Sequence, residues 1–217
     1  MRRISTRSAI DATKLIHTDG SADTLALRRD GADFTVTVTA AVVNVPYTSY
    51  ELLSDGVGYL RIFGFNGHVV QETGDALAAL VSAGATSLVL DLRDNPGGWV
   101  NDAQSIADIF LDKGTLCYLQ YKNGERYYYR TKDGKVEMQL VILVNENSAS
   151  SSEILTGALR DRANATVVGK KTYGKGIVQS VVPLSDGSGM QITVAQYYTP
   201  NGYAVHKQGI TPDVEVD

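Results

Sequence analysis

A serine-rich loop offers the first candidate for chemistry. Residues 145–153 read Asn-Glu-Asn-Ser-Ala-Ser-Ser-Ser-Glu and lie between an apolar stretch and an expected helix. A serine at a helix N-terminus lies beside free N–H groups, which stabilise an alkoxide or the oxyanion of a tetrahedral intermediate. Ser150 and Glu153 also have the spacing of a capping box, in which the serine serves only the helix end. Taken alone, the loop favours this structural interpretation.

The second candidate is the loop at residues 91–98, Asp-Leu-Arg-Asp-Asn-Pro-Gly-Gly. Its place after an expected strand matters, because open α/β sheets bind ligands at the carboxyl ends of their strands. Consecutive glycines let backbone N–H groups approach an anion without obstruction by a Cβ atom. A plain Pro-Gly turn is the simpler interpretation. Asp91 and Arg93 are expected to pair structurally rather than to catalyse.

The third candidate is the loop at residues 169–176, Gly-Lys-Lys-Thr-Tyr-Gly-Lys-Gly. Its Gly-x4-Gly-Lys pattern resembles a phosphate-binding P-loop, which would make the chain a nucleotide-binding protein. However, Gly176 supplies no hydroxyl for Mg²⁺, and the β-branched residues after it predict a strand where a P-loop needs a helix. The P-loop interpretation is therefore weak.

A serine nucleophile also needs a base. None of the three histidines, His17, His68 and His206, lies in a motif poised for a triad. A neutral lysine can replace histidine, although the reference pKa of lysine is about 10.4 and a useful base lies near about 7–8. Lys175 is the candidate base, because two glycines flank it and an apolar strand follows it. Gln179, four residues later, is placed to orient it by a hydrogen bond.

The elements that must position these loops alternate between strand and helix from residue 56 onward. Two of the expected strands, 87–92 and 140–144, are nearly continuous apolar runs, which predict burial on both faces. Further strands are expected at 57–63, 166–168, 177–183, 190–198 and on both sides of the turn at 122–124. Helices are expected at 73–83, 102–111 and 151–159. The fold class is therefore α/β.

The first 45 residues read differently. A short helix is expected at 11–16, and two alternating strands at 24–27 and 34–39 flank a hairpin turn at 29–31. A linker follows at 44–47. The sequence thus predicts a β-rich segment, residues 1–45, before a core of residues 46–217.

Composition limits the function classes. The 217 residues are 43% hydrophobic and 20% charged, enough apolar surface to exclude a disordered or collagen-like polymer. With a net charge of −4 the chain has no overall positive field of the kind that attracts nucleic acid, so no nucleic-acid partner is expected. No apolar run is long enough to span a bilayer, and the first residues do not form a signal peptide. Cys117, the single cysteine, forms neither an internal disulfide nor a cysteine-rich metal site.

Four segments together resemble the carboxyl-terminal processing peptidases, also called tail-specific proteases. They are VLDLRDNPGG, VNENSASSSEI, VVGKKTYGKGIVQ and DGSGMQITVAQYYTPNGYAVHKQGITPDVEV, in the family's order. The resemblance implies a serine endopeptidase with a crotonase-like ββα-type core, a mixed sheet, and neither a metal nor an organic cofactor. It assigns the nucleophile to Ser150, the base to Lys175, 25 residues later, and the orienting group to Gln179. The implied oxyanion donors are the N–H of Ser151 and that of Gly97 or Gly98.

The resemblance also extends to the first segment and to the partners. Residues 9–40, with the segments ATKLI and TLALRRDGADFTVTVT, resemble the end of a PDZ domain without its carboxylate-binding loop. The implied substrate is a polypeptide with an accessible, largely apolar carboxyl-terminal tail, and homo-oligomerisation stays open. The implied location is extracytoplasmic, in the periplasm or cell envelope. The alternative is a catalytically silent module of the same fold that only binds peptides.

Overall fold

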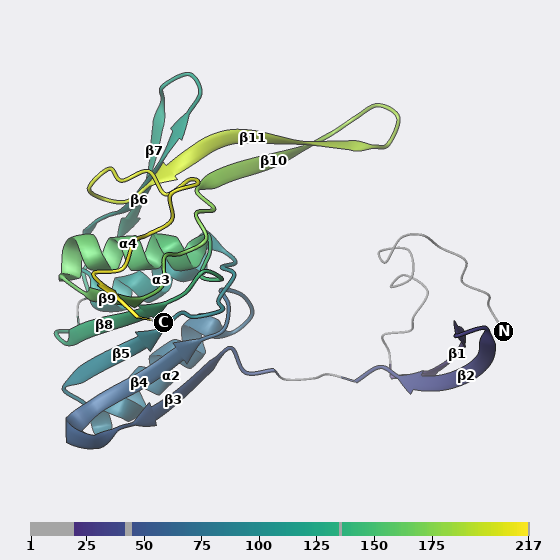
Figure 1. Cartoon of the computed structure of the whole chain (residues 1–217), viewed down its shortest axis with the longest axis horizontal. Helices are drawn as coiled ribbons and strands as arrows, with labels where there is room; N and C mark the ends of the chain where they lie inside the picture. Colours follow the sequence, from purple (N-terminus) through teal and green to yellow (C-terminus); the bar gives the residue numbers. More distant parts are fainter. Residues whose placement is uncertain (1–19, 42–44, 135, 217) are drawn as a thin grey trace. The chain divides into compact units, whose positions relative to one another are not determined.

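The computed structural model describes residues 20–41, 45–134 and 136–216. The helix expected at 11–16 lies outside these residues. The chain forms two compact units, Met1–Val45 and Pro46–Asp217 (Figure 1).

In the first unit the described residues form one hairpin. Strands β1 (Ala22–Arg29) and β2 (Ala32–Thr39) pair in antiparallel fashion along their whole length. Asp30 and Gly31 form the two-residue turn. Such a turn needs positive φ at both positions, and their φ values are 52° and 81°. Both predicted strands and the turn between them are confirmed, whereas the resemblance to a PDZ domain stays a prediction.

A six-stranded mixed sheet forms the base of the second unit. Its strand order is β12-β9-β8-β5-β4-β3, in which only the β3–β4 pair is antiparallel. Because the other neighbours are parallel, the loops after β5 and β8 leave the sheet at one edge. The strands are β3 (Thr48–Leu52), β4 (Val57–Ile62), β5 (Ser87–Asp91), β8 (Gln139–Val144), β9 (Thr166–Gly169) and β12 (Val214–Glu215).

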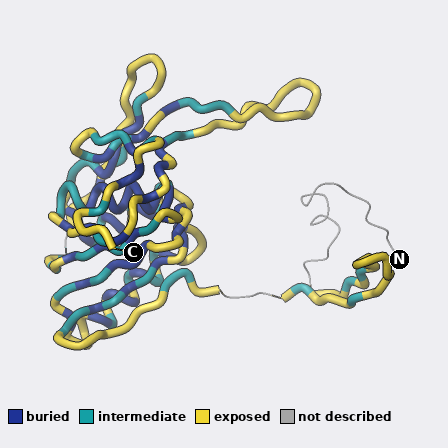
Figure 2. The backbone as a smooth tube through the Cα atoms, in the orientation of Figure 1, coloured by how far each residue is buried: buried dark blue, intermediate teal, exposed yellow. Residues whose placement is uncertain are grey.

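A four-stranded antiparallel sheet carries the tyrosine-rich segments. Its strand order is β10-β11-β6-β7, so that β10 and β7 are its edges. The strands are β6 (Gly114–Tyr121), β7 (Arg126–Thr131), β10 (Ile177–Pro183) and β11 (Gly189–Tyr198). The far part of the β10–β11 hairpin projects from the unit and is exposed, whereas the buried residues gather around the helices and the parallel strands (Figure 2).

Three helices and a short 3-10 turn (Ser54–Gly56) complete the second unit. They are α2 (Val69–Ser82), α3 (Val100–Phe110) and α4 (Ser151–Ala163). Helix α2 packs against β3 and β4, and α4 contacts α3, β6 and β9. Since α4 touches both sheets, all residues of its first nine positions are buried. No helix in the described parts of the chain has the length and apolarity to cross a membrane.

Three details differ from the expectations. The strands β5 and β8 were expected to be buried on both faces, which is wrong: Leu88, Leu90 and Ile142 are fully buried, but Val89 and Val141 on the opposite face are only half-buried. Both strands read as continuous apolar runs because the half-buried positions on their less covered face also carry apolar residues. Helix α2 begins at Val69, four residues before the expected start, and the short strands β3 and β12 gave no recognisable pattern.

Candidate active site

Ser150 lies between β8 and α4, at the point where the strand's loop turns into the helix. Its φ of 57° and ψ of −115° are unusual for a residue with a side chain. A residue persists in such a conformation only where its surroundings hold it there, which is common at functional sites. The strand–turn–helix connection therefore presents Ser150 at the N-terminal end of α4, where helix N–H groups stabilise negative charge.

Glu153 holds this loop to the lysine-bearing loop. Its side chain is fully buried, and one oxygen, Oε2, accepts the backbone N–H groups of both Ser150 and Lys175 at 2.9 Å each. The bond to Ser150 is the glutamate half of the expected capping box. Three more donors reach the carboxylate: Gly174 N–H at 2.7 Å, Thr172 Oγ1 at 2.6 Å and the Tyr197 hydroxyl at 3.3 Å. The carboxylate thus joins the backbones of the two residues proposed from sequence as nucleophile and base.

Lys175 is exposed and lines a hollow of about 550 Å³ together with Tyr173, Gly174, Ile177, His206 and Lys207. From the sequence, His206 was not expected to lie in a catalytic motif. The structure brings it beside Lys175. Gly176, the residue after Lys175, lies so close that a Cβ atom on it would clash with the backbone nitrogen of His206. Its Nδ1 is buried and has no hydrogen-bond partner among the described residues. Because His206 and Lys175 lie far apart in the sequence, no local pattern predicted this contact.

Gln179 lies on β10, and its Oε1 accepts a hydrogen bond from Gln191 Nε2 at 3.1 Å. Within the described part of the chain, no side-chain hydrogen bond joins Lys175 to Ser150 or to Gln179. The orienting role of Gln179 therefore stays a prediction. The expected strand after Gly176 is present as β10, which is the feature that argued against a P-loop.

The Pro-Gly-Gly loop lies directly against Ser150. A Cβ atom on Gly97 would lie 2.7 Å from the Ala149 carbonyl oxygen and 2.8 Å from the Ser150 Cβ. Only glycine fits there, and its φ of 98° also favours glycine. The Gly98 carbonyl accepts the Ser151 hydroxyl at 2.8 Å, while the Gly97 N–H donates to Asn95 Oδ1 at 2.9 Å. The structure thus brings together four of the residues proposed from sequence: Ser150, Ser151, Gly97 and Gly98.

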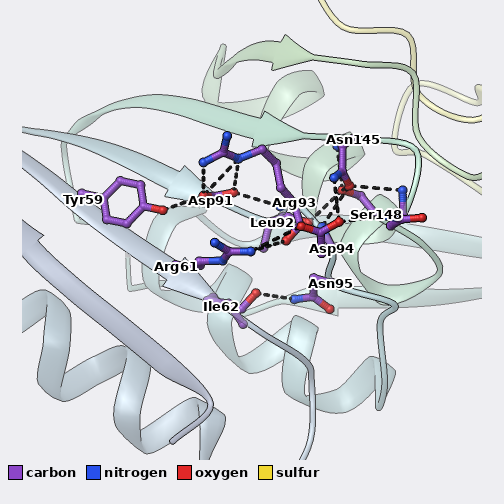
Figure 3. Close-up of polar contacts among 11 residues, drawn as sticks. Tyr59, Arg61, Ile62, Asp91, Leu92, Arg93, Asp94, Asn95, Asn145 and Ser148 are labelled. Carbon is purple, nitrogen blue, oxygen red and sulfur yellow. Dashed lines mark hydrogen bonds and ion pairs between the residues drawn. The ribbon is translucent and has the colours of Figure 1, made fainter. Parts of the chain in front are cut away.

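An ion pair between the buried Asp91 and the partly exposed Arg93 lies at the end of β5, before this loop (Figure 3). Asp91 has no exposed side-chain surface, and Arg93 donates to its carboxylate through Nη2 at 2.7 Å and Nε at 3.0 Å. The Tyr59 hydroxyl from β4 donates to the same group at 2.6 Å. Burial by itself would raise the pKa of Asp91, but the hydrogen bonds from Arg93 and Tyr59 outweigh it and lower that pKa. The expected structural pairing of Asp91 with Arg93 is confirmed.

A second set of contacts joins the loop after β5 to the loop after β8. Asp94 Oδ1 accepts the side-chain amides of Asn145 at 2.8 Å and Asn147 at 2.9 Å, as part of the network in Figure 3. The Ser148 hydroxyl donates to the Leu92 carbonyl at 2.7 Å. These contacts fix the glycine loop relative to the serine loop, so that both flank one site at the edge of the parallel strands.

Other reactive groups lie elsewhere. Cys117 is buried, and burial raises the pKa of its thiol to about 12, which keeps it protonated. Across the described ranges, no group of three or more His, Cys, Asp or Glu side chains gathers as a metal site.

The family model described as Peptidase family S41 matches residues 56–216, which is most of the chain. The chain belongs to peptidase family S41. It is 43% identical over 162 residues to a carboxyl-terminal-processing protease of Synechocystis sp., covering 74% of the chain and 38% of that relative. It is also 40% identical over 221 residues to carboxyl-terminal-processing peptidase 2, chloroplastic, of Arabidopsis thaliana, covering 96% of the chain and 43% of that relative.

A solved structure agrees with this S41 assignment. The photosystem II D1 C-terminal processing protease superposes with a TM-score of 0.74 at 33% identity, covering 91% of the chain and 56% of that structure. The resemblance stated from four sequence motifs is therefore confirmed at the level of the family and of a mixed α/β fold. The S41 chain spans about two-fifths of the length of these two curated relatives.

Replacing Asp91 of this S41 chain by asparagine should lower the free energy of unfolding by about 2–3 kcal/mol near neutral pH, because a buried charge-assisted network is broken. The native pKa of Asp91 lies below its unfolded value of about 3.9, so the stabilisation is present above about pH 4 and is lost as the pH falls through the native pKa. Urea unfolding should show the gap between wild type and variant shrinking in acid.

The matched control is Asp94→Asn, since the Asp94 side chain is 55% exposed and its loss should cost much less. A stability of Asp91→Asn equal to that of wild type near neutral pH would contradict a structural role for the ion pair.

Proposed function

We propose that this S41 chain carries the catalytic core of a serine endopeptidase that cleaves polypeptides near their carboxyl-terminal tails. Ser150 attacks the scissile carbonyl, and Lys175 accepts its proton and later donates a proton to the leaving amine. Gln179 orients the lysine. The single observation that carries the proposal is the shared carboxylate of Glu153, which binds the Ser150 and Lys175 backbones through one oxygen.

The oxyanion that forms on the attacked carbonyl needs two N–H donors. We propose the N–H of Ser151, the first residue of α4, and an N–H of the Pro-Gly-Gly loop. Since the Gly97 N–H already donates to Asn95, that of Gly98 is the stronger candidate of the two. The close approach of Gly97 to Ser150 supports this placement, because it puts the loop against the nucleophile.

The names of the relatives support a proposal about substrate class and location. The names of the Synechocystis and Arabidopsis relatives describe carboxyl-terminal processing, and the Arabidopsis name adds a chloroplast location. We propose a polypeptide substrate with an apolar tail, an extracytoplasmic location, and a PDZ-like nature for residues 1–45. The silent peptide-binding module is the alternative, and it predicts binding without cleavage.

The test is incubation of the chain with an unstructured peptide that ends in an apolar tail, followed by mass spectrometry of the products. We expect internal cleavage that is unchanged by a chelator, because no proposed step uses a metal. Intact peptide that remains bound to the chain would support the silent module instead.

A further inference from the structure

The edge strand β10 leads directly out of the candidate active site. We propose that the main chain of the substrate adds to the free edge of β10 as a further strand of the four-stranded sheet. One substrate side chain then enters the hollow that Lys175 and His206 line. This inference rests on the proposed function and names how the polypeptide is held.

Position supports β10 as the receiving strand. It begins at Ile177, two residues after Lys175, and Ile177 itself lines the hollow. The Ser150 and Lys175 nitrogens lie within about 6 Å of each other, because each bonds the same Glu153 oxygen at 2.9 Å. A chain paired with the start of β10 therefore passes beside the nucleophile, as a scissile segment must.

The edge is exposed over most of its length, beyond the half-buried Ile177 and Val178. Among the strands that the structure describes, β10 pairs with β11 alone, and its last five residues are exposed. Proteins usually protect such an edge with charged side chains or by covering it, because its unpaired N–H and C=O groups accept another strand. Between residues 177 and 191 the only charged residue is Asp186, in the turn. The exposed apolar side chains there are those of Val181, Val182, Leu184 and Met190.

The opposite edge of the same sheet looks different. Strand β7 carries Arg126 and Arg130, which lie over the rings of Tyr118 at 4.9 Å and Tyr128 at 5.2 Å. These arginines are the charged protection that β10 lacks. This contrast favours β10 over β7 as the strand that receives the substrate. The uncharged, apolar side chains of β10 also match an uncharged, apolar segment of polypeptide.

Strand addition makes a prediction about the substrate. Main-chain hydrogen bonds tolerate many sequences, while a pocket for one side chain supplies selectivity. In an added strand every second residue directs its N–H toward β10 and the residues between direct theirs away. Methylation of a backbone nitrogen should therefore weaken binding at alternate positions only.

The experiment measures binding to the Ser150→Ala variant, so that the result does not depend on turnover. A fluorescent peptide with an apolar tail is methylated at one backbone nitrogen at a time, and Kd is measured by anisotropy. We expect Kd to rise three- to tenfold at every second position and to change less than twofold between them. A flat profile, or one without a two-residue period, would overturn the proposal.

Two protein variants test which edge strand of the four-stranded sheet binds the peptide. Val181→Lys places a charge on β10 at a side chain that is 67% exposed, and Tyr127→Lys places the same charge on β7 at one that is 54% exposed. We expect Val181→Lys to raise Kd about fivefold or more and Tyr127→Lys to leave it unchanged. Equal effects would overturn the proposal, as would a Val181→Lys variant that changes only the sedimentation coefficient, since β10 would then bind a second copy of the chain.

The two proposals fail differently. If wild type cleaves and the methylation profile is flat, the peptidase function stands and strand addition to β10 is wrong. If wild type does not cleave but the alternating profile appears, strand addition stands and the catalytic proposal is wrong.

Discussion

The Ser150→Ala variant should hydrolyse peptide with kcat lowered by about 10⁴-fold or more, because it lacks the proposed nucleophile of the covalent step. The fold should persist, since alanine at a helix N-cap costs only about 1 kcal/mol. Initial rates on the unstructured peptide and urea unfolding of the same preparation check both statements. Ser82→Ala, at the exposed last residue of α2, is the control and should keep wild-type kcat.

The base can be tested in the same assay. Lys175→Met removes the amine but keeps a long side chain, and we expect a loss of kcat similar to that of Ser150→Ala. The double variant should be no slower than either single variant, because residues that act as a unit are not additive. Lys171→Met removes an exposed lysine of the same loop and serves as the control. Substantial activity in Lys175→Met would refute the Ser–Lys dyad.

Glu153→Gln should lower kcat by about 100-fold and the free energy of unfolding by about 2–4 kcal/mol. An amide has one oxygen acceptor and an NH2 group, which would face N–H donors where the carboxylate now accepts. An NH2 group in place of Oε2 removes the acceptor of the Ser150 and Lys175 N–H groups, and one in place of Oε1 removes that of the Thr172 hydroxyl and the Gly174 N–H. We expect KM to change little, because Glu153 is fully buried and does not reach the substrate.

Tyr197 provides a graded comparison for Glu153. Burial, followed by the neighbouring charge of Glu153, raises the pKa of Tyr197 well above its usual value, so its hydroxyl stays a donor. Tyr197→Phe removes the hydroxyl's bonds to Glu153 Oε2 at 3.3 Å and to the Ser150 carbonyl at 3.2 Å, and should cost about 1–2 kcal/mol with only a small change in kcat. Wild-type kcat in Glu153→Gln, measured by steady-state kinetics, would show that the carboxylate has no positioning role.

Much of the fold could be predicted because local patterns and tertiary packing agree. The strand β8 and the helix α4 follow from an apolar run and a capping signal that are local in sequence. The turn at Asp30 and Gly31 follows from the residues that tolerate positive φ. By contrast, the two-residue strand β12 is a strand only because it pairs with β9, and no local property specifies it.

The site divides in the same way. Ser150, Lys175 and the glycine pair could be proposed because the motifs that carry the family resemblance are continuous segments, although the serine loop and the glycine loop taken alone favoured structural interpretations. The partners of Glu153 could not, since Thr172, Gly174 and Tyr197 come from segments that only packing brings to one carboxylate. The position of His206 beside Lys175 could not be predicted for the same reason.

The sequence by itself determined the α/β class, the order of the elements and the family to which the chain belongs, because periodicity and short motifs are properties of consecutive residues. Only the tertiary structure decided that one buried carboxylate joins the two loops, that an imidazole borders the lysine's hollow, and that β10 rather than β7 is the unprotected edge. These depend on contacts between residues far apart in the chain, which arise from packing the two sheets around α4.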